Sequence, residues 1–185
     1  GDVLAPFPQA LYSSFHTTAG YLDQSLAIRL NRQRDGLAPY LSFFRNVFPE
    51  GAGYKHDELE LRKELSDEQR QTEPLNADSH LAFISAGLRS CVAYRGRSAD
   101  PVYFIDLDGM NAGRPRRRVT TVLGFNAEQT VACARISVPM SAHPVDSVNL
   151  KDSRLGIYQR CRDLIVANGV TKGRIQLALA PSEDQ

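Results

Sequence analysis

The spacing of apolar residues changes near residue 90, and this change limits the folds open to the chain. Before it, the residues Leu37, Leu41, Phe44 and Phe48 recur at three- and four-residue steps, which predicts a helix ending near Pro49. After it, short runs rich in β-branched residues are separated by turn-forming residues, as strands are. Helices and strands therefore occupy largely separate parts of the sequence.

The remaining elements follow from caps, turns and composition. A short strand is predicted at 11–15, and Asp23 is expected to cap a helix after it. Further helices are expected at 76–86 and 153–168, the latter with Asp152 or Ser153 as its N-cap. Strands are expected at 91–94, 102–105, 118–123, 130–136 and 174–180, with 118–123 and 130–136 forming an antiparallel hairpin.

Charge and composition narrow the classes of partner. The 185 residues carry 22 basic and 21 acidic side chains, a formal net charge of +1, which gives no general attraction to nucleic acid or anionic membranes. No apolar run approaches the roughly 20 residues that span a bilayer. The three cysteines, Cys91, Cys133 and Cys161, form no CxxC pair and are expected to be reduced and mostly buried, as in the cytoplasm.

Three of the four histidines lie in distinctive segments. These are His16-Thr-Thr-Ala-Gly20, Gly53-Tyr-Lys-His56 and Asn76-Ala-Asp-Ser-His80. Three imidazoles are a common ligand set for zinc and leave one position for water or substrate. Their separations match no local metal-binding motif, so ordinary structural histidines are the alternative. His143 is expected to be structural or incidental.

A cluster of arginines follows Asp108-Gly109, namely Arg114, Arg116, Arg117 and Arg118. Guanidinium groups match phosphate oxygens, which favours an anion site. In a strand, Arg116 and Arg118 would share one face and Arg117 the other. The alternative is a charged edge that discourages aggregation between strands.

The histidine segments and the Asp108-Gly109 to Val119 stretch together resemble the motifs of the YjbQ-like family, in the family's order. The resemblance covers roughly residues 11–123. It implies an α+β fold with a mixed, largely antiparallel sheet, helices packed on it, and assembly as a homotrimer. It also implies a divalent metal, zinc in the first place, held by His16, His56 and His80; magnesium would suit a pyrophosphate substrate.

The family is associated with a thiamine-phosphate synthase-like transfer between phosphorylated precursors. We therefore expect a metal-dependent enzyme acting on a phosphorylated small molecule, with a non-catalytic metal- or ligand-binding trimer as the alternative. Asp57 and Asp78 are the candidate catalytic carboxylates. The residues expected to contact substrate are Thr18, Asn76, Arg116 and Arg118.

The carboxyl-terminal part suggests a rearranged domain. Residues 1–185 are expected to form a single YjbQ-like domain in which 141–185 is a strand–helix extension. This extension resembles the family's amino-terminal lead-in, which the sequence lacks before its first motif. We expect it to replace that lead-in, within one subunit or across the trimer.

Overall fold

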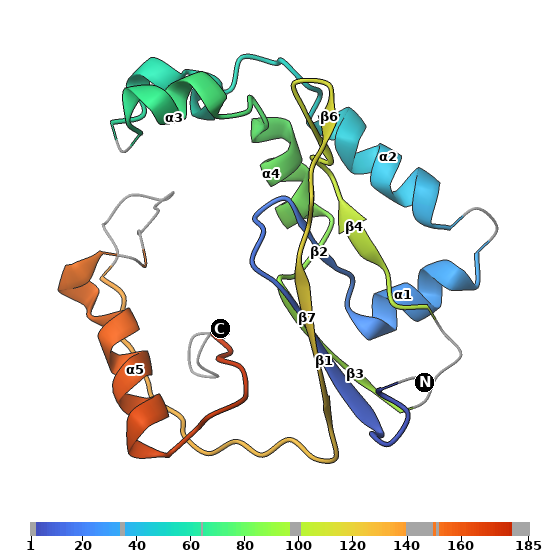
Figure 1. Cartoon of the computed structure of the whole chain (residues 1–185), viewed down its shortest axis with the longest axis vertical. Helices are drawn as coiled ribbons and strands as arrows, with labels where there is room; N and C mark the ends of the chain where they lie inside the picture. The colour runs from blue at the N-terminus through green and yellow to red at the C-terminus, as the bar shows by residue number, and fades with distance from the viewer. Residues whose placement is uncertain are drawn as a thin grey trace. The chain divides into compact units, whose positions relative to one another are not determined.

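The computed structural model describes residues 3–33, 36–63, 65–96, 101–139, 150 and 152–178. The chain divides into two compact units, Gly1–Ala127 and Glu128–Gln185 (Figure 1). All the candidate site residues belong to the first unit.

A three-stranded antiparallel sheet forms the frame of the first unit. Its order is β3 (Cys91–Arg95), β1 (Gln9–Ser14) and β7 (Thr120–Phe125), so β1 is paired along both edges. Tyr12 lies opposite Val92 on one side and Val122 on the other. Tyr12 packs on the core, and because side chains alternate along a strand, Ala10 and Ser14 point to that same face.

Two smaller ladders complete the strands of this unit. Strand β2 (Ala19–Tyr21) pairs antiparallel with β4 (Phe104–Asp106). Strands β5 (Met110–Asn111) and β6 (Arg114–Pro115) form an exposed hairpin. Ala112 and Gly113 at its tip both have positive φ, the conformation of a tight two-residue hairpin turn.

The first unit is an α+β fold with helices packed on antiparallel sheet, as predicted. Asp23 caps α1 (Gln24–Asn31) by accepting the Ser25 N–H, and α2 (Leu37–Val47) follows it. Helix α4 (Ala77–Ser85) ends before Gly87, whose positive φ suits a helix terminus. The buried side chains that join helices and strands include Tyr21, Leu22, Leu30, Phe83, Leu88, Val92, Tyr94, Ile105 and Leu107.

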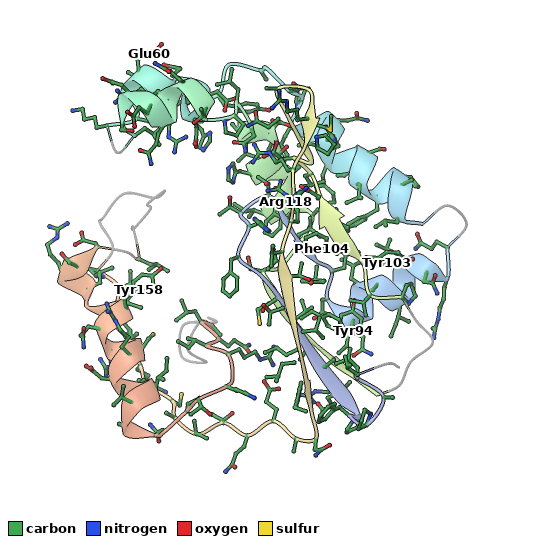
Figure 2. The ribbon with its side chains drawn as sticks, viewed as in Figure 1. Glu60, Tyr94, Tyr103, Phe104, Arg118 and Tyr158 are labelled. Atoms are coloured by element: carbon green, nitrogen blue, oxygen red, sulfur yellow. The ribbon has the colours of Figure 1, made fainter. Side chains whose placement is uncertain are left out.

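Aromatic contacts hold the two ladders together. The Tyr12 ring lies 5.6 Å, centroid to centroid, from the rings of both Tyr21 and Tyr94. Tyr21 in turn lies 5.2 Å from Phe104 of β4. Figure 2 labels Phe104 and Tyr94 among the side chains of this unit. The Tyr94 hydroxyl donates to the Leu22 carbonyl oxygen at 3.1 Å, which gives this buried polar group a partner.

The polar stretch between α2 and α4 contains only short helices among its described residues. These are η1 (Lys55–Asp57), η2 (Leu59–Leu61) and α3 (Asp67–Thr72). Ser66 and Gln69 form a capping box at the start of α3. The Arg62 guanidinium donates to Glu73 at 2.9 Å and ties the end of η2 to the end of α3.

In the second unit, the predicted helix begins later than expected. Asp152 caps the short helix η3 (Ser153–Leu155), and α5 (Ile157–Ala167) starts after Gly156. The left-handed conformation of Gly156 separates the two helices. Gly169 has positive φ just beyond α5, as predicted.

Some predictions about strands and cysteines were wrong. Strand β7 pairs with β1, and no ladder joins it to residues 130–136, which form no strand among the described residues. The described part of the predicted strand 174–180, residues 174–178, likewise forms none. None of the cysteines is fully buried: Cys133 is exposed, while Cys91 and Cys161 are half-buried.

No helix in the described ranges is both long and apolar enough to cross a membrane. The role predicted for the 141–185 extension remains a prediction, and so does the treatment of 1–185 as one domain. His143 lies outside the described residues.

Candidate functional site

The loop between β1 and β2 carries His16 and Thr18 and is held by one buried hydroxyl. Ser14 Oγ donates to the Ala19 carbonyl oxygen at 2.8 Å and accepts the His16 N–H at 3.2 Å. Position 20 requires glycine, because a Cβ there would lie 2.5 Å from the Arg89 carbonyl oxygen. The small residues of the first motif therefore allow β2 to approach the chain at Arg89.

His16 contacts the segment that leads into β7. Its Nε2 accepts the Val119 backbone N–H at 3.2 Å, which puts the proton of the neutral ring on Nδ1. Thr18, two residues after His16, is buried, and its hydroxyl lies 3.5 Å from Arg118 Nη2. The first motif and the arginine segment are therefore neighbours in space.

The other two motif histidines lie side by side. The rings of His56, in η1, and His80, in α4, are 4.9 Å apart between centroids and inclined by 53°. Burial lowers the pKa of His80, and the neighbouring His56 lowers it further, while the carboxylate of Asp108 opposes both effects. His80 is therefore held mainly as a neutral imidazole at pH 7, the form that binds metals.

Asp57 connects this histidine pair to the start of α4. Its Oδ1 lies 3.2 Å from His56 Nδ1 and accepts the Ala77 N–H at 3.1 Å. The carboxylate thus satisfies a free N–H of the first helical turn and orients the His56 ring. Through these two contacts Asp57 positions the His56 ring and the start of α4.

Asp78 is directed into the protein. Its side chain is buried, and its Oδ2 accepts from the Ser79 hydroxyl at 3.3 Å. Ser79 Oγ also lies 2.9 Å from the Leu107 carbonyl oxygen. These contacts join α4 to the chain following β4 and favour a structural role for Asp78.

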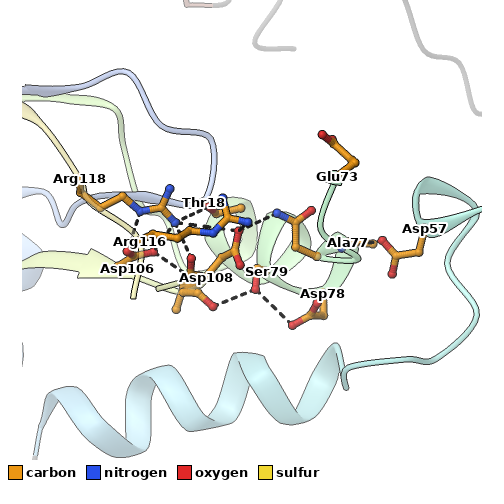
Figure 3. A network of polar contacts seen from close by, with 12 residues as sticks. Thr18, Asp57, Glu73, Ala77, Asp78, Ser79, Asp106, Asp108, Arg116 and Arg118 are labelled. Carbon is orange, nitrogen blue, oxygen red and sulfur yellow. Dashed lines mark hydrogen bonds and ion pairs between the residues drawn. The ribbon is translucent and has the colours of Figure 1, made fainter. Parts of the chain in front are cut away.

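Two carboxylates that were not predicted as site residues, Asp106 and Asp108, organise the arginines (Figure 3). Arg118 Nε and Nη2 donate to the two oxygens of Asp106 at 2.7 and 2.8 Å, and Nη2 also donates to the Asp108 carbonyl oxygen at 2.6 Å. This pairing lowers the pKa of Asp106 against the opposing effect of burial, which is the larger single influence, and raises that of Arg118. The donors of Arg118 named here are thus used within the protein.

Asp108 joins the remaining predicted ligands. Its Oδ2 accepts from Asn76 Nδ2 at 2.7 Å and lies 3.2 Å from Arg116 Nη2. Arg116 and Arg118 therefore share one acidic partner, as expected of alternate residues, while Arg117 is exposed. The spacing Asp106-x-Asp108-Gly109 before a basic segment was the sequence signal for these carboxylates.

One polar network consequently reaches most of the predicted residues. It extends from His56 through Asp57 to the start of α4, and from Asn76 through Asp108 to the two arginines and Thr18. His16 connects to it through the backbone of Val119. No direct contact between His16 and the histidine pair is seen among the described residues.

The donor chemistry fits a divalent metal in part. His56 and His80 place two imidazoles together, and the contact of Asp57 with His56 Nδ1 leaves Nε2 of that ring for a ligand. The Nε2 of His16 is used by Val119, and within the described part of the chain no group of three His, Cys, Asp or Glu side chains is arranged to hold a metal. The three-histidine site remains a prediction.

Comparisons with known proteins identify no relative: no family model, no curated protein and no solved structure matches the chain.

Proposed function

We propose that this protein is a metal-dependent enzyme acting on a phosphorylated small molecule, with thiamine-phosphate synthase-like transfer as its specific form. The observation that carries the proposal is that Asp108, which Arg116 and Asn76 both approach, also acts electrostatically on His80, the partner of His56 in the histidine pair. Imidazoles can bind a metal, and a guanidinium can bind phosphate oxygens. The resemblance to the YjbQ-like family supports the same reading and adds a homotrimer in the cytoplasm.

The chain's own residues have distinct parts in this function. His56 and His80 would hold zinc, with His16 as the third ligand once its ring leaves Val119, whereas magnesium would accompany a pyrophosphate substrate. Such a metal supplies Lewis acidity toward a phosphate oxygen. Arg116 would bind the departing phosphate, and Asp57 would fix the orientation of His56.

A second candidate is a non-catalytic metal- or ligand-binding protein. Asp57 caps a helix and Asp78 is buried against Ser79, so both predicted catalytic carboxylates have structural partners. That observation favours binding over general base catalysis by either residue.

Metal analysis combined with a turnover assay separates the two candidates. Zinc-loaded protein, freed of excess metal, is expected to hold stoichiometric zinc and to turn over a phosphorylated substrate; His80→Ala should lose both. Lys55→Ala, an exposed neighbour of His56, is the matched control and should keep both. Zinc retained without turnover of any phosphorylated compound supports the second candidate. Wild-type protein without zinc contradicts the metal-dependent enzyme and the metal-binding form of the second candidate, and leaves only its ligand-binding form.

A further inference from the structure

One edge of the Arg116 guanidinium has no aligned acceptor. The two atoms are Nε and Nη2, both buried and both without a hydrogen-bond partner among the described residues. Nη2 lies 3.2 Å from Asp108 Oδ2, close enough for an ion pair but not aligned as a hydrogen bond. The Nε–Nη2 edge is one of the two sides on which a guanidinium binds an oxyanion through two parallel hydrogen bonds.

Among the described residues, Asn76 has a buried acceptor without a hydrogen bond, where Arg116 has buried donors without one. Its side-chain Oδ1 is buried and accepts no hydrogen bond within the described structure, while Nδ2 donates to Asp108 Oδ2 at 2.7 Å. The opposite amide orientation would place two oxygens against each other, so Oδ1 must be the unpaired atom. Asn76 is 92% buried, since only 8% of its surface is exposed.

These unpaired atoms belong to two residues that share one partner. Asp108 Oδ2 is the atom that both Asn76 and Arg116 approach. Leaving a buried polar group without a hydrogen bond costs about 1–3 kcal/mol, so each such group in a native protein calls for an explanation, of which a catalytic role or a bound ion is one. Arg118 beside them has its donors satisfied by Asp106 and Asp108.

We propose that Arg116 and Asn76 form a subsite for an oxyanion that also offers a hydroxyl hydrogen. Two anion oxygens would accept from Arg116 Nε and Nη2, and the hydroxyl would donate to Asn76 Oδ1. The inference rests on the proposed function and specifies how its phosphate is recognised. The hydroxyl belongs either to the phosphate itself, as in hydrogen phosphate, or to a neighbouring carbon of the substrate.

The charge distribution explains why a hydroxyl hydrogen is required. Asp108 stands beside the subsite and repels any bound anion, whereas a hydrogen directed at Asn76 Oδ1 offsets part of that repulsion. Entry requires Arg116 to turn away from Asp108, because the unpaired atoms are closed to solvent. Arg116 directly follows the exposed β5–β6 hairpin, whose movement would accompany that turn.

Sulfate and inorganic phosphate test this subsite because they share shape and oxygens. At neutral pH phosphate keeps a hydroxyl and sulfate has none. Calorimetric titration of the whole chain should show phosphate bound about tenfold more tightly, the equivalent of one net hydrogen bond. Arg116→Lys, which keeps the charge but not the two-pronged edge, should weaken both ions, and Asn76→Ala should remove the preference for phosphate.

Arg117→Lys is the matched control, since Arg117 is exposed, and should bind as the wild type does. Circular dichroism shows whether Asn76→Ala folds. If it does not fold, the binding of the two ions to Arg116→Lys still tests the subsite. Equal affinity for sulfate and phosphate in the wild type, or unchanged binding in Arg116→Lys, would overturn the inference.

Organic phosphates identify the source of the hydroxyl. At about pH 8 methyl phosphate has lost its second phosphate proton, while glycerol 2-phosphate keeps carbon-bound hydroxyls. Tighter binding of glycerol 2-phosphate than of both methyl phosphate and inorganic phosphate assigns the donor to the substrate's carbon skeleton, and tightest binding of inorganic phosphate assigns it to the phosphate. Zinc and turnover lost in His80→Ala without any phosphate preference would refute this subsite and leave the proposed function standing. Phosphate preference without turnover would refute only the enzymatic proposal.

Discussion

Arg118, between the β5–β6 hairpin and β7, holds Asp106 at the end of β4 through two hydrogen bonds, from Nε at 2.7 Å and from Nη2 at 2.8 Å. Both side chains are largely buried, with 12% and 21% of their surfaces exposed. The pair fixes the course of the chain that carries Arg116 and Val119. It thereby connects the arginine segment to β4.

Arg118→Ala is expected to destabilise the first unit by about 2 kcal/mol, because it leaves the largely buried Asp106 carboxylate without the guanidinium that donates two hydrogen bonds to it. Urea unfolding followed by circular dichroism measures the loss. Arg114→Ala, at an exposed position, should change the unfolding free energy by less than about 0.5 kcal/mol. A loss in Arg118→Ala as small as in this control would show that the pair contributes little.

Tyr94 is expected to make the fold sensitive to alkali. Burial raises the pKa of Tyr94 to about 12, from 10.0. Between these pH values the unfolded chain loses the phenol proton and the folded chain keeps it, so stability falls as pH rises, by on the order of 2–3 kcal/mol in total. Urea unfolding at several pH values between about 9 and 12 should show the fall.

Tyr94→Phe should remove that alkaline component and cost about 1 kcal/mol at neutral pH, through the lost hydrogen bond to Leu22. Tyr158→Phe, at a residue that is 55% exposed, is the control and should retain the wild-type pH dependence. An unchanged alkaline slope in Tyr94→Phe would assign the effect to another group.

Gly20→Ala should destabilise the fold by about 2–3 kcal/mol, because the added Cβ meets backbone at Arg89 and the Phe83 ring 3.0 Å away. Thermal unfolding gives the measurement. Gly173→Ala is the control, since its Cβ would make only an ordinary 3.5 Å contact with Val170. Equal midpoints for the two variants would mean that β2 can move away from Arg89 at little cost.

The stability that Asp57 gives to helix α4 should be largely kept with asparagine at this position and lost with alanine. Asp57→Ala removes the acceptor of the Ala77 N–H and should cost about 1 kcal/mol, as lost helix caps do. Asp57→Asn keeps an oxygen there and should cost less. Denaturant unfolding of the two variants decides between capping and charge, because equal losses would point to charge.

The helices were predictable because their signals are local. The three- and four-residue spacing of Leu37 to Phe48 and the cap at Asp23 depend only on neighbours in sequence. The prediction of a hairpin between 118–123 and 130–136 was wrong because strand pairing is not local. Strand β7 pairs with β1, which lies more than a hundred residues away in the sequence. The polar sequence Asn126-Ala-Glu-Gln129 contains no glycine to specify a tight turn between the two segments.

Sequence reasoning indicated several of the residues that lie together, but not the contacts that they make with one another. The second and third motifs indicated His56 and His80, whose rings are adjacent. Sequence reasoning could not show that Asp57 caps α4 or that Arg118 is engaged by Asp106, since both contacts depend on tertiary geometry. It also omitted Asp108, the residue on which Asn76 and Arg116 converge.

The position of β1 between two other strands has a dynamic consequence. A strand paired along both edges opens only when much of its sheet opens, so the amide hydrogens of Leu11 to Ser13 should be among the slowest to exchange with solvent. His16 is attached directly to that slow-opening strand, whereas His56 lies in a single short turn. Any closure of the three imidazoles around a cation would therefore bring the η1 turn toward His16, whose backbone stays in place while its ring turns away from Val119.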